Sequence, residues 1–254
     1  MLLTAMTRDE LLREHSVEAI SRRLRAGPRY SYLRDLVYGA IDGTVTTFAV
    51  VAGVVGADLK TNIVIILGVA NLLADGFSMA VSNYLGTRAE QEQHARARMT
   101  EESHIEVLPE GEREEIRQIF AGKGFSGEQL DQVVEVITSD RQLWVETMMK
   151  EELGLPTHEV SALRAACYTM LAFVAVGSLP LVAYAIDAAF PGAIGEPFVL
   201  SAVMTAFAFT MVGAAKSRFV LVPWWRSSLE TLLVGGIAAT LAFAAGIFLS
   251  GLVD

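Results

Sequence analysis

The sequence predicts an all-α membrane protein with five transmembrane helices, a cytoplasmic domain of three helices and a cytoplasmic N-terminus. Three observations predict this fold class. The chain is 52% hydrophobic and yet 19% charged, and the charged residues are separated from the apolar runs. Several of these runs are long enough to cross a bilayer. Nearly all Lys and Arg residues fall on one side of the runs.

A helix needs about 20 consecutive apolar residues to cross the hydrocarbon core of a bilayer. The last three of the candidate spans contain no Asp, Glu, Lys or Arg. An odd number of spans would place the two ends of the chain on opposite sides of the membrane. The candidate spans are 36–57, 61–87, 165–186, 197–215 and 231–253.

The positions of the basic residues predict the orientation. Of the 20 Lys and Arg residues, only Lys60 lies on the side opposite the N-terminus. Because basic residues favour the cytoplasmic side, we expect the N-terminus and the long segment after the second span in the cytoplasm, and Asp254 outside. The short loop around Lys60 predicts that the first two spans form a helical hairpin.

The spans divide the chain into four parts, which are 1–33, 34–88, 89–160 and 161–254. The first part contains a predicted amphipathic helix over residues 8–25. Two states remain open for this helix, which either lies on the membrane surface or packs on the cytoplasmic domain. Its apolar face consists of Leu11, Leu12, Ile20 and Leu24.

Residues 89–160 are predicted to form a small acidic domain. This part carries 17 Asp or Glu residues against 7 Lys or Arg residues. Its pattern predicts helices at 89–106, 110–121 and 128–153, the first of which could continue the second span.

Two aspartates fall inside candidate spans, Asp42 in the first and Asp75 in the second. A charged carboxylate at the centre of a bilayer costs at least about 2.5–3.5 kcal/mol, so such residues are candidates for function. Met79 lies four residues after Asp75 and hence on the same helical face. This set favours a path for transition ions such as ferrous iron. The alternative is that the aspartates cap helices near the interface and that Met79 only packs.

Gly39 and Gly43 form a face of small residues on the first span, which permits close contact between helices. This face supports either a dimer interface or a tight hairpin, and the sequence does not decide between them.

The acidic domain repeats a metal-ligand spacing on its predicted helices. Residues three apart share a helical face, and a Glu-x-x-His pair on a bundle helix is one known way to hold iron. Carboxylate, imidazole and thioether donors together favour transition ions over calcium. The alternative is that the glutamates form a solvated face and the methionines fill a core. The candidate ligands are Glu101, His104, Glu112, Glu115, Met148, Met149 and Glu152.

Several function classes lack support in the sequence. It contains no phosphate-binding P-loop, no Ser/His/Asp grouping and no Cys-x-x-Cys pair. Its acidic balance argues against a nucleic-acid partner. We therefore expect that the protein is not an enzyme and that any transport is driven by a gradient.

Four stretches of the chain carry a family resemblance. The sequences DLVYGAIDGTVTTFAVVAGVVGA (35–57) and GVANLLADGFSMAVSNYLGTRAE (68–90) resemble the first hairpin of the vacuolar iron transporter family. PEGEREEI (109–116) and MMKEELGL (148–155) extend the resemblance into the acidic domain.

The resemblance implies a homodimer that exports ferrous iron and related divalent ions from the cytosol in exchange for protons. It implies a pathway near the dimer interface that uses Asp42 and Met79, and a three-helix metal-binding domain that collects ions. Two positions depart from the family pattern, because His104 and Asn83 stand where glutamates are expected. We expect His104 to alter ion preference or pH response, and Asn83, which cannot titrate, to carry no proton.

Our working hypothesis is a multi-pass transporter in the lipid of a prokaryotic plasma membrane, with no tightly bound cofactor. Fe²⁺ is the expected substrate, with Mn²⁺, Co²⁺, Ni²⁺ and Zn²⁺ left open. One alternative is a membrane-anchored protein that binds, stores or senses iron without transport. Another is a carrier of protons or small solutes whose acidic domain is regulatory.

Overall fold

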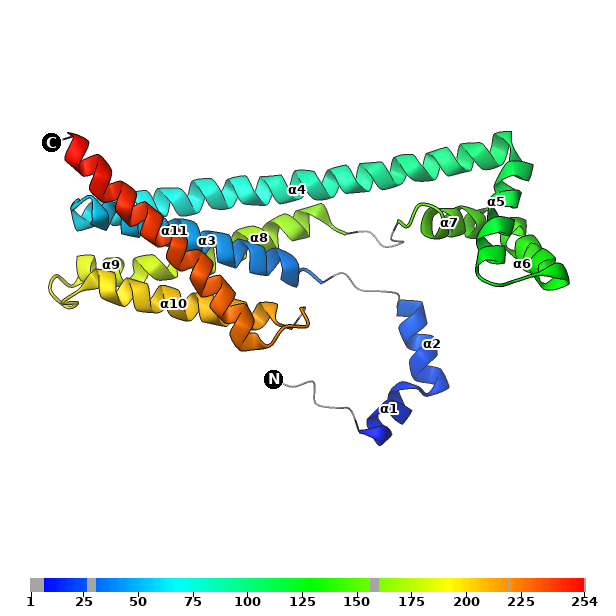
Figure 1. The fold of residues 1–254 in the computed structure, drawn as a ribbon, viewed down its shortest axis with the longest axis horizontal. Helices are drawn as coiled ribbons and strands as arrows, with labels where there is room; N and C mark the ends of the chain where they lie inside the picture. The colour runs from blue at the N-terminus through cyan, green and yellow to red at the C-terminus, as the bar shows by residue number, and fades with distance from the viewer. Residues whose placement is uncertain (1–6, 27–30, 156–159, 219, 254) are drawn as a thin grey trace. The chain divides into compact units, whose positions relative to one another are not determined.

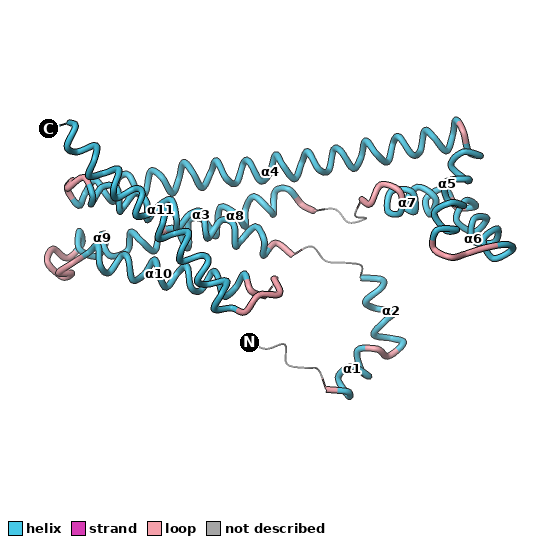
Figure 2. The backbone as a smooth tube through the Cα atoms, in the orientation of Figure 1, coloured by secondary structure: helices cyan, strands magenta, loops and turns pink. Residues whose placement is uncertain are grey.

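The computed structural model describes residues 7–26, 31–155, 160–218 and 220–253, and these residues form helices and turns without a strand (Figure 1; Figure 2). The chain divides into two compact units. Unit 1 comprises Met1–Leu85 and Ala162–Asp254, and unit 2 comprises Gly86–Ser161.

Four helices among the described residues are long and apolar enough to cross a membrane, and these are α3 (Leu33–Gly56), α4 (Thr61–Val107), α10 (Pro197–Lys216) and α11 (Trp224–Val253). The pair of α8 (Ala162–Gly177) and α9 (Leu179–Ala189) passes the same test together and adds a fifth candidate span. The predicted all-α architecture with several apolar spans is thus confirmed. The cytoplasmic placement of the N-terminus and of the acidic domain stays a prediction.

The third predicted span, 165–186, is broken. Helices α8 and α9 are bent by 49° where they meet. Pro180 lies in the first turn of α9, where its missing N–H and its ring interrupt a continuous helix. The carbonyl oxygen of Pro180 accepts a hydrogen bond of 2.6 Å from Oγ of Ser201. This bond ties the bend to α10.

Helix α3 is the central element of unit 1, because it packs against α8, α10 and α11 (Figure 1). Val51 of α3 and Phe173 of α8 are fully buried in the core of the unit. Burial of such side chains stabilises the arrangement by about 1.5–3 kcal/mol each.

The glycine face of α3 packs against α8. A Cβ atom on Gly39 would lie 2.3 Å from the carbonyl oxygen of Thr169, and one on Gly43 would lie 2.5 Å from that of Phe173. The face therefore provides close contact within the chain, and it is neither the dimer interface nor the hairpin contact that the sequence left open. The sequence alone did not identify this partner, because α8 lies far along the chain from α3.

The amphipathic segment before the first span forms two helices, α1 (Arg8–Glu14) and α2 (Val17–Ala26). His15 leaves helical geometry with φ −101° and ψ 14°. Oγ of Ser16 then accepts a hydrogen bond of 3.3 Å from the N–H of Ala19 and caps α2. The prediction of a single helix over 8–25 is wrong for this reason.

Helix α4 is longer than a bilayer is thick. It has 47 residues, whereas about 20 residues cross the roughly 30 Å of hydrocarbon. Its first part belongs to unit 1 and its second part, from Gly86, belongs to unit 2. The helix predicted at 89–106 does continue the second span.

Unit 2 contains the end of α4 together with α5 (Pro109–Gly122), α6 (Gly127–Ser139) and α7 (Arg141–Glu151). The sequence predicted three helices here, with one helix over 128–153, and this prediction is wrong. Oδ1 of Asp140 accepts hydrogen bonds from the N–H groups of Gln142 and Leu143, at 2.9 and 3.2 Å. Asp140 therefore ends α6 and caps α7.

Unit 2 has a hydrophobic core of its own. Ile116 and Met148 are fully buried, and Trp144 and Val145 are nearly so. These residues form one cluster with apolar residues of α6. A separate core of this kind is typical of an independent domain.

Candidate functional site

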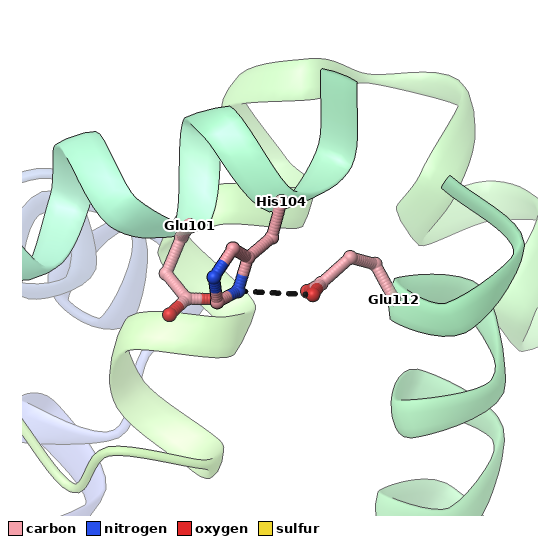
Figure 3. Close-up of side chains that lie close together, drawn as sticks. All are labelled: Glu101, His104 and Glu112. Carbon is pink, nitrogen blue, oxygen red and sulfur yellow. Dashed lines mark ion pairs between the residues drawn. The ribbon is translucent and has the colours of Figure 1, made fainter. Parts of the chain in front are cut away.

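Three side chains of unit 2 point toward one another (Figure 3). Glu101 and His104 come from α4 and Glu112 comes from α5. One ligand atom of each lies within 4.8 Å of the others, and Nδ1 of His104 is 3.3 Å from Oε1 of Glu112. The chain turns between the two helices at Leu108, and Pro109 begins α5 at a position where no N–H is needed. We call these three residues the carboxylate–histidine cluster.

The two carboxylates of this cluster are buried. Glu101 and Glu112 expose 4% and 5% of their surface, whereas more than half of the His104 side chain is exposed. Oε2 of each glutamate is buried and has no hydrogen-bond partner within the described parts of the chain. A buried carboxylate oxygen without a partner is unfavourable, so each of these atoms needs a proton or a cation.

The glutamates in and around the cluster raise one another's pKa values. The pKa of Glu112 is raised to about 7, mainly by burial and also by the charges of Glu115, Glu101 and Glu152, while His104 opposes the rise. Burial raises the pKa of Glu101, with His104 opposing and Glu115 adding to the effect. Loss of hydration and the charges of Glu101 and Glu115 raise the pKa of Glu152. A bound cation would relieve this repulsion.

The donor atoms of the cluster suit a transition ion. Two carboxylates and an imidazole match the ligands of Fe²⁺, Mn²⁺, Co²⁺, Ni²⁺ and Zn²⁺, whereas Ca²⁺ prefers six to eight oxygens. The imidazole of His104 is exposed, so one donor of the cluster is in contact with solvent.

The other four predicted ligands are placed differently. Met148 and Met149 belong to the hydrophobic core of unit 2, with 0% and 8% of their surface exposed. Glu115 and Glu152 are exposed and act on the cluster through their charges. Metal ligation by these four residues stays a prediction.

The predicted pathway residues of unit 1 lie on α3 and α4. Asp42 is partly buried, Asp75 is exposed on the surface of the single chain, and the two carboxylates are close enough to repel one another. Met79 is partly buried and packs against the core of unit 1.

A polar connection joins the two helices beside Asp42. Nδ2 of Asn71 on α4 donates a hydrogen bond of 3.3 Å to Oγ1 of Thr46 on α3. Oγ1 of Thr46 in turn donates one of 2.9 Å to the carbonyl oxygen of Asp42. Polar groups are therefore continuous from Asp42 to α4.

Residues 33–247 match the VIT family. The chain belongs to this family. Among the VIT-family relatives, "Vacuolar iron transporter 1" of Arabidopsis thaliana is 34% identical over 212 residues, which cover 83% of each chain. "Vacuolar iron transporter" of Toxoplasma gondii is 33% identical over 221 residues, covering 85% of this chain and 73% of the relative. "Vacuolar iron transporter" of Plasmodium falciparum is 32% identical over 223 residues, which cover 85% of this chain and 82% of the relative.

These matches confirm the family resemblance that the two hairpin motifs indicated. The VIT-family relatives are named as transporters and not as enzymes, in agreement with the prediction that the chain is not an enzyme. The apolar helices confirm a multi-pass integral membrane protein. The expectation of a prokaryotic plasma membrane finds no support, because the relatives are named for the vacuole.

Asp35, the first residue of the stretch 35–57, was not among the predicted site residues. Asp35 lies in the first turn of α3 and exposes 4% of its surface. Nδ2 of Asn83 on α4 donates hydrogen bonds to its Oδ1 at 2.9 Å and to Oγ1 of Thr169 on α8 at 2.7 Å. Asn83 thus joins three helices. The available signal was the seven-residue spacing of Asp35 and Asp42, which puts both on one face of α3.

Proposed function

We propose that this VIT-family protein transports Fe²⁺ and related divalent transition ions, moving them out of the cytosol in exchange for protons. The observation that carries the proposal is the pair of carboxylates, Asp42 on α3 and Asp75 on α4, in helices able to span a membrane. The names of the relatives support iron as the substrate.

Carboxylates in membrane-spanning helices are energetically unfavourable, so their presence indicates a function. A helix that only anchors a protein does not need them. A carboxylate that binds a metal ion must first lose its proton, so metal ions and protons compete for Asp42 and Asp75. An ion that leaves toward an acidic compartment is replaced by protons, which gives exchange without ATP. The thioether of Met79, one helical turn from Asp75, favours softer ions over Mg²⁺ and Ca²⁺.

In this proposal, the carboxylate–histidine cluster collects ions for transport. The negative charge of unit 2 raises the local concentration of cations. The unpartnered oxygens of Glu101 and Glu112 then bind one of them. Their buried position makes binding depend on pH, because protons occupy the same atoms.

The exposed position of Asp75 supports a homodimer. Its neighbours Leu73 and Phe77 are also exposed, with 60% and 65% of their surface accessible. A carboxylate that faced lipid in this apolar setting would be costly. A second copy of the chain packed on this face of α4 would remove Asp75 from lipid and bring two pathways together.

Uptake of Fe²⁺ into liposomes that contain the purified protein tests the proposal. The wild type should accumulate iron faster when a proton gradient is imposed, and Asp42→Asn should abolish this stimulated uptake. Asp187→Asn is the matched control, because Asp187 of α9 lies in unit 1 close to the end of its helix, where it accepts a hydrogen bond from the N–H of Gly192.

The rival function is an anchored module that binds iron and does not move it. It predicts metal binding by the carboxylate–histidine cluster, no uptake into liposomes, and no effect of Asp42→Asn on any property. Normal uptake by Asp42→Asn would contradict the proposed pathway, and absence of uptake with intact metal binding would favour the rival.

A further inference from the structure

Helix α2 (Val17–Ala26) carries an apolar stripe that the described chain leaves uncovered. None of its residues is buried, and Val17 and Leu24 expose 78% and 72% of their surface. A shallow groove runs along the stripe, lined by Val17, Ile20, Ser21, Leu24 and Arg25. A contiguous exposed apolar surface marks a site of interaction with a protein or a membrane.

Basic side chains are arranged around this stripe. Successive residues of a helix are about 100° apart, so Val17, Ile20 and Leu24 fall within a sector of about 60°. Arg23 and Arg25 lie on the two flanks of that sector. In a helix lying in a membrane interface, the apolar face enters the acyl region and cationic side chains extend to the headgroups.

The arginines of α2 have no acidic partner among the residues that the structure describes. None of the ion pairs among the described residues involves Arg22, Arg23 or Arg25. Glu18 is the one acidic residue of the helix. The guanidinium group of Arg25 donates hydrogen bonds of 3.2 and 2.7 Å to Oγ of Ser21, beside the stripe. This charge is complementary to anionic phosphate headgroups.

Helix α2 is also tethered close to the bilayer. Six residues separate Ala26 from Leu33, where the spanning helix α3 begins. A chain of this length reaches at most about 25 Å. The short tether keeps α2 at a high effective concentration beside the membrane surface, so even weak binding to lipid would hold it there.

From this arrangement we propose that α2 lies in the interface of a bilayer containing anionic lipid, with Val17, Ile20 and Leu24 among the acyl chains and the flanking Arg23 and Arg25 at the phosphate headgroups. The helix anchors the segment that precedes the first span. This role is separate from the ion pathway and does not depend on the proposed transport function.

Nitroxide labels on the full-length protein test the proposal. Cys167 is the one cysteine of the chain, so Cys167→Ser gives a background for single labels. Leu24→Cys places a label on the stripe, and Ala26→Cys places the matched control on the opposite face. In vesicles with phosphatidylglycerol, the label at 24 should be accessible to oxygen and shielded from a water-soluble nickel complex. The label at 26 should remain accessible to nickel.

The charge dependence distinguishes lipid from protein as the partner. Each arginine near an anionic surface changes binding by about fivefold, so replacing Arg23 and Arg25 by Gln should strongly weaken the shielding at 24. About 1 M salt, which shortens the screening length to about 3 Å, should weaken it. Equal shielding in purely neutral phosphatidylcholine vesicles, or shielding that survives removal of the arginines, would indicate another contact and overturn the proposal. Nickel access at 24 in anionic vesicles would also overturn it.

Discussion

Nδ1 of His104 lies 3.3 Å from Oε1 of Glu112, so an exposed imidazole meets a buried carboxylate at the junction of α4 and α5. The contact joins an imidazole nitrogen, a donor of intermediate softness, to hard oxygen donors within one cluster. It also gives the cluster one face open to water. The metal preference and the pH response of unit 2 should both depend on this pair.

Replacement of His104 should change which ions bind. His104→Gln removes the imidazole donor, which Co²⁺, Ni²⁺ and Zn²⁺ prefer more strongly than Mn²⁺ does. We expect their affinity to fall by about tenfold, or 1.4 kcal/mol, with a smaller loss for Mn²⁺. Calorimetric titration of the full-length protein with each ion measures these affinities. His94→Gln on the same helix is the control, and an equal loss for every ion would contradict ligation by His104.

Glu112 should make the stability of metal-free unit 2 depend on pH. Its pKa in the folded protein is about 7 against an ordinary value of 4.5, so the folded state binds more protons between these values. Stability should therefore fall as pH rises from about 4.5 to about 7 and stay level above. At pH 8, Glu112→Gln should be more stable than wild type by at most about 3 kcal/mol.

Fluorescence of buried Trp144 measures this unfolding in a background where Trp224 and Trp225 are replaced by Phe. Near pH 4 the wild type and Glu112→Gln should have the same stability, because the carboxyl group is then neutral in both states. Addition of Co²⁺ should stabilise the wild type and not the variant. Equal pH profiles for the two proteins would show that Glu112 is not the responsible group.

A side chain on the glycine face of α3 should separate α3 from α8. A Cβ atom on Gly43 would lie 2.5 Å from a backbone oxygen of Phe173, and backbone cannot move aside cheaply. Gly43→Ala should lower the stability of the membrane protein by about 1–3 kcal/mol, measured by thermal unfolding in nanodiscs. A Cβ atom on Gly236 of α11 would meet no atom of another described segment within 4 Å, so Gly236→Ala should be neutral or slightly stabilising.

The Asn83–Asp35 bond should stabilise unit 1 in a way that depends on the charge of Asp35. Asn83→Leu leaves both oxygens of a buried carboxylate without a partner, which should cost about 1–3 kcal/mol. In an Asp35→Asn background the same change should cost less, because a neutral amide is easier to bury. A double-mutant cycle measures the difference, and an additive result would mean that the two residues are not coupled.

Local features of the fold were predictable and tertiary partners were not. Apolar runs identified α3, α10 and α11, since hydropathy is a property of each segment alone. The bend at Pro180 and the helix start at Asp140 each depend on a single residue. The apolar and helical patterns around these two residues continue across them, so the patterns alone did not reveal the breaks. The contact of Gly43 with Phe173 joins segments far apart in the chain, and no local pattern specifies it.

The candidate site was predictable to a similar extent. The three-residue spacing of Glu101 and His104 placed them on one face of a helix, but only the turn at Leu108 brings Glu112 to them. Met148 and Met149 matched ligands by residue type, whereas their burial in the core of unit 2 follows from packing. Asp35 was not predicted as a site residue, because its burial and its hydrogen bond with Asn83 are tertiary features that the local sequence does not show.

The most direct test of the account is the movement of protons during iron uptake. Vesicles containing the protein are loaded with a pH-sensitive dye, and Fe²⁺ is added outside under reducing conditions. The account predicts that the vesicle interior becomes more alkaline as iron enters, in wild type and in Asp187→Asn, and that Asp42→Asn shows neither change. Iron entry without a pH change, or an unchanged signal in Asp42→Asn, would contradict exchange of iron for protons at Asp42.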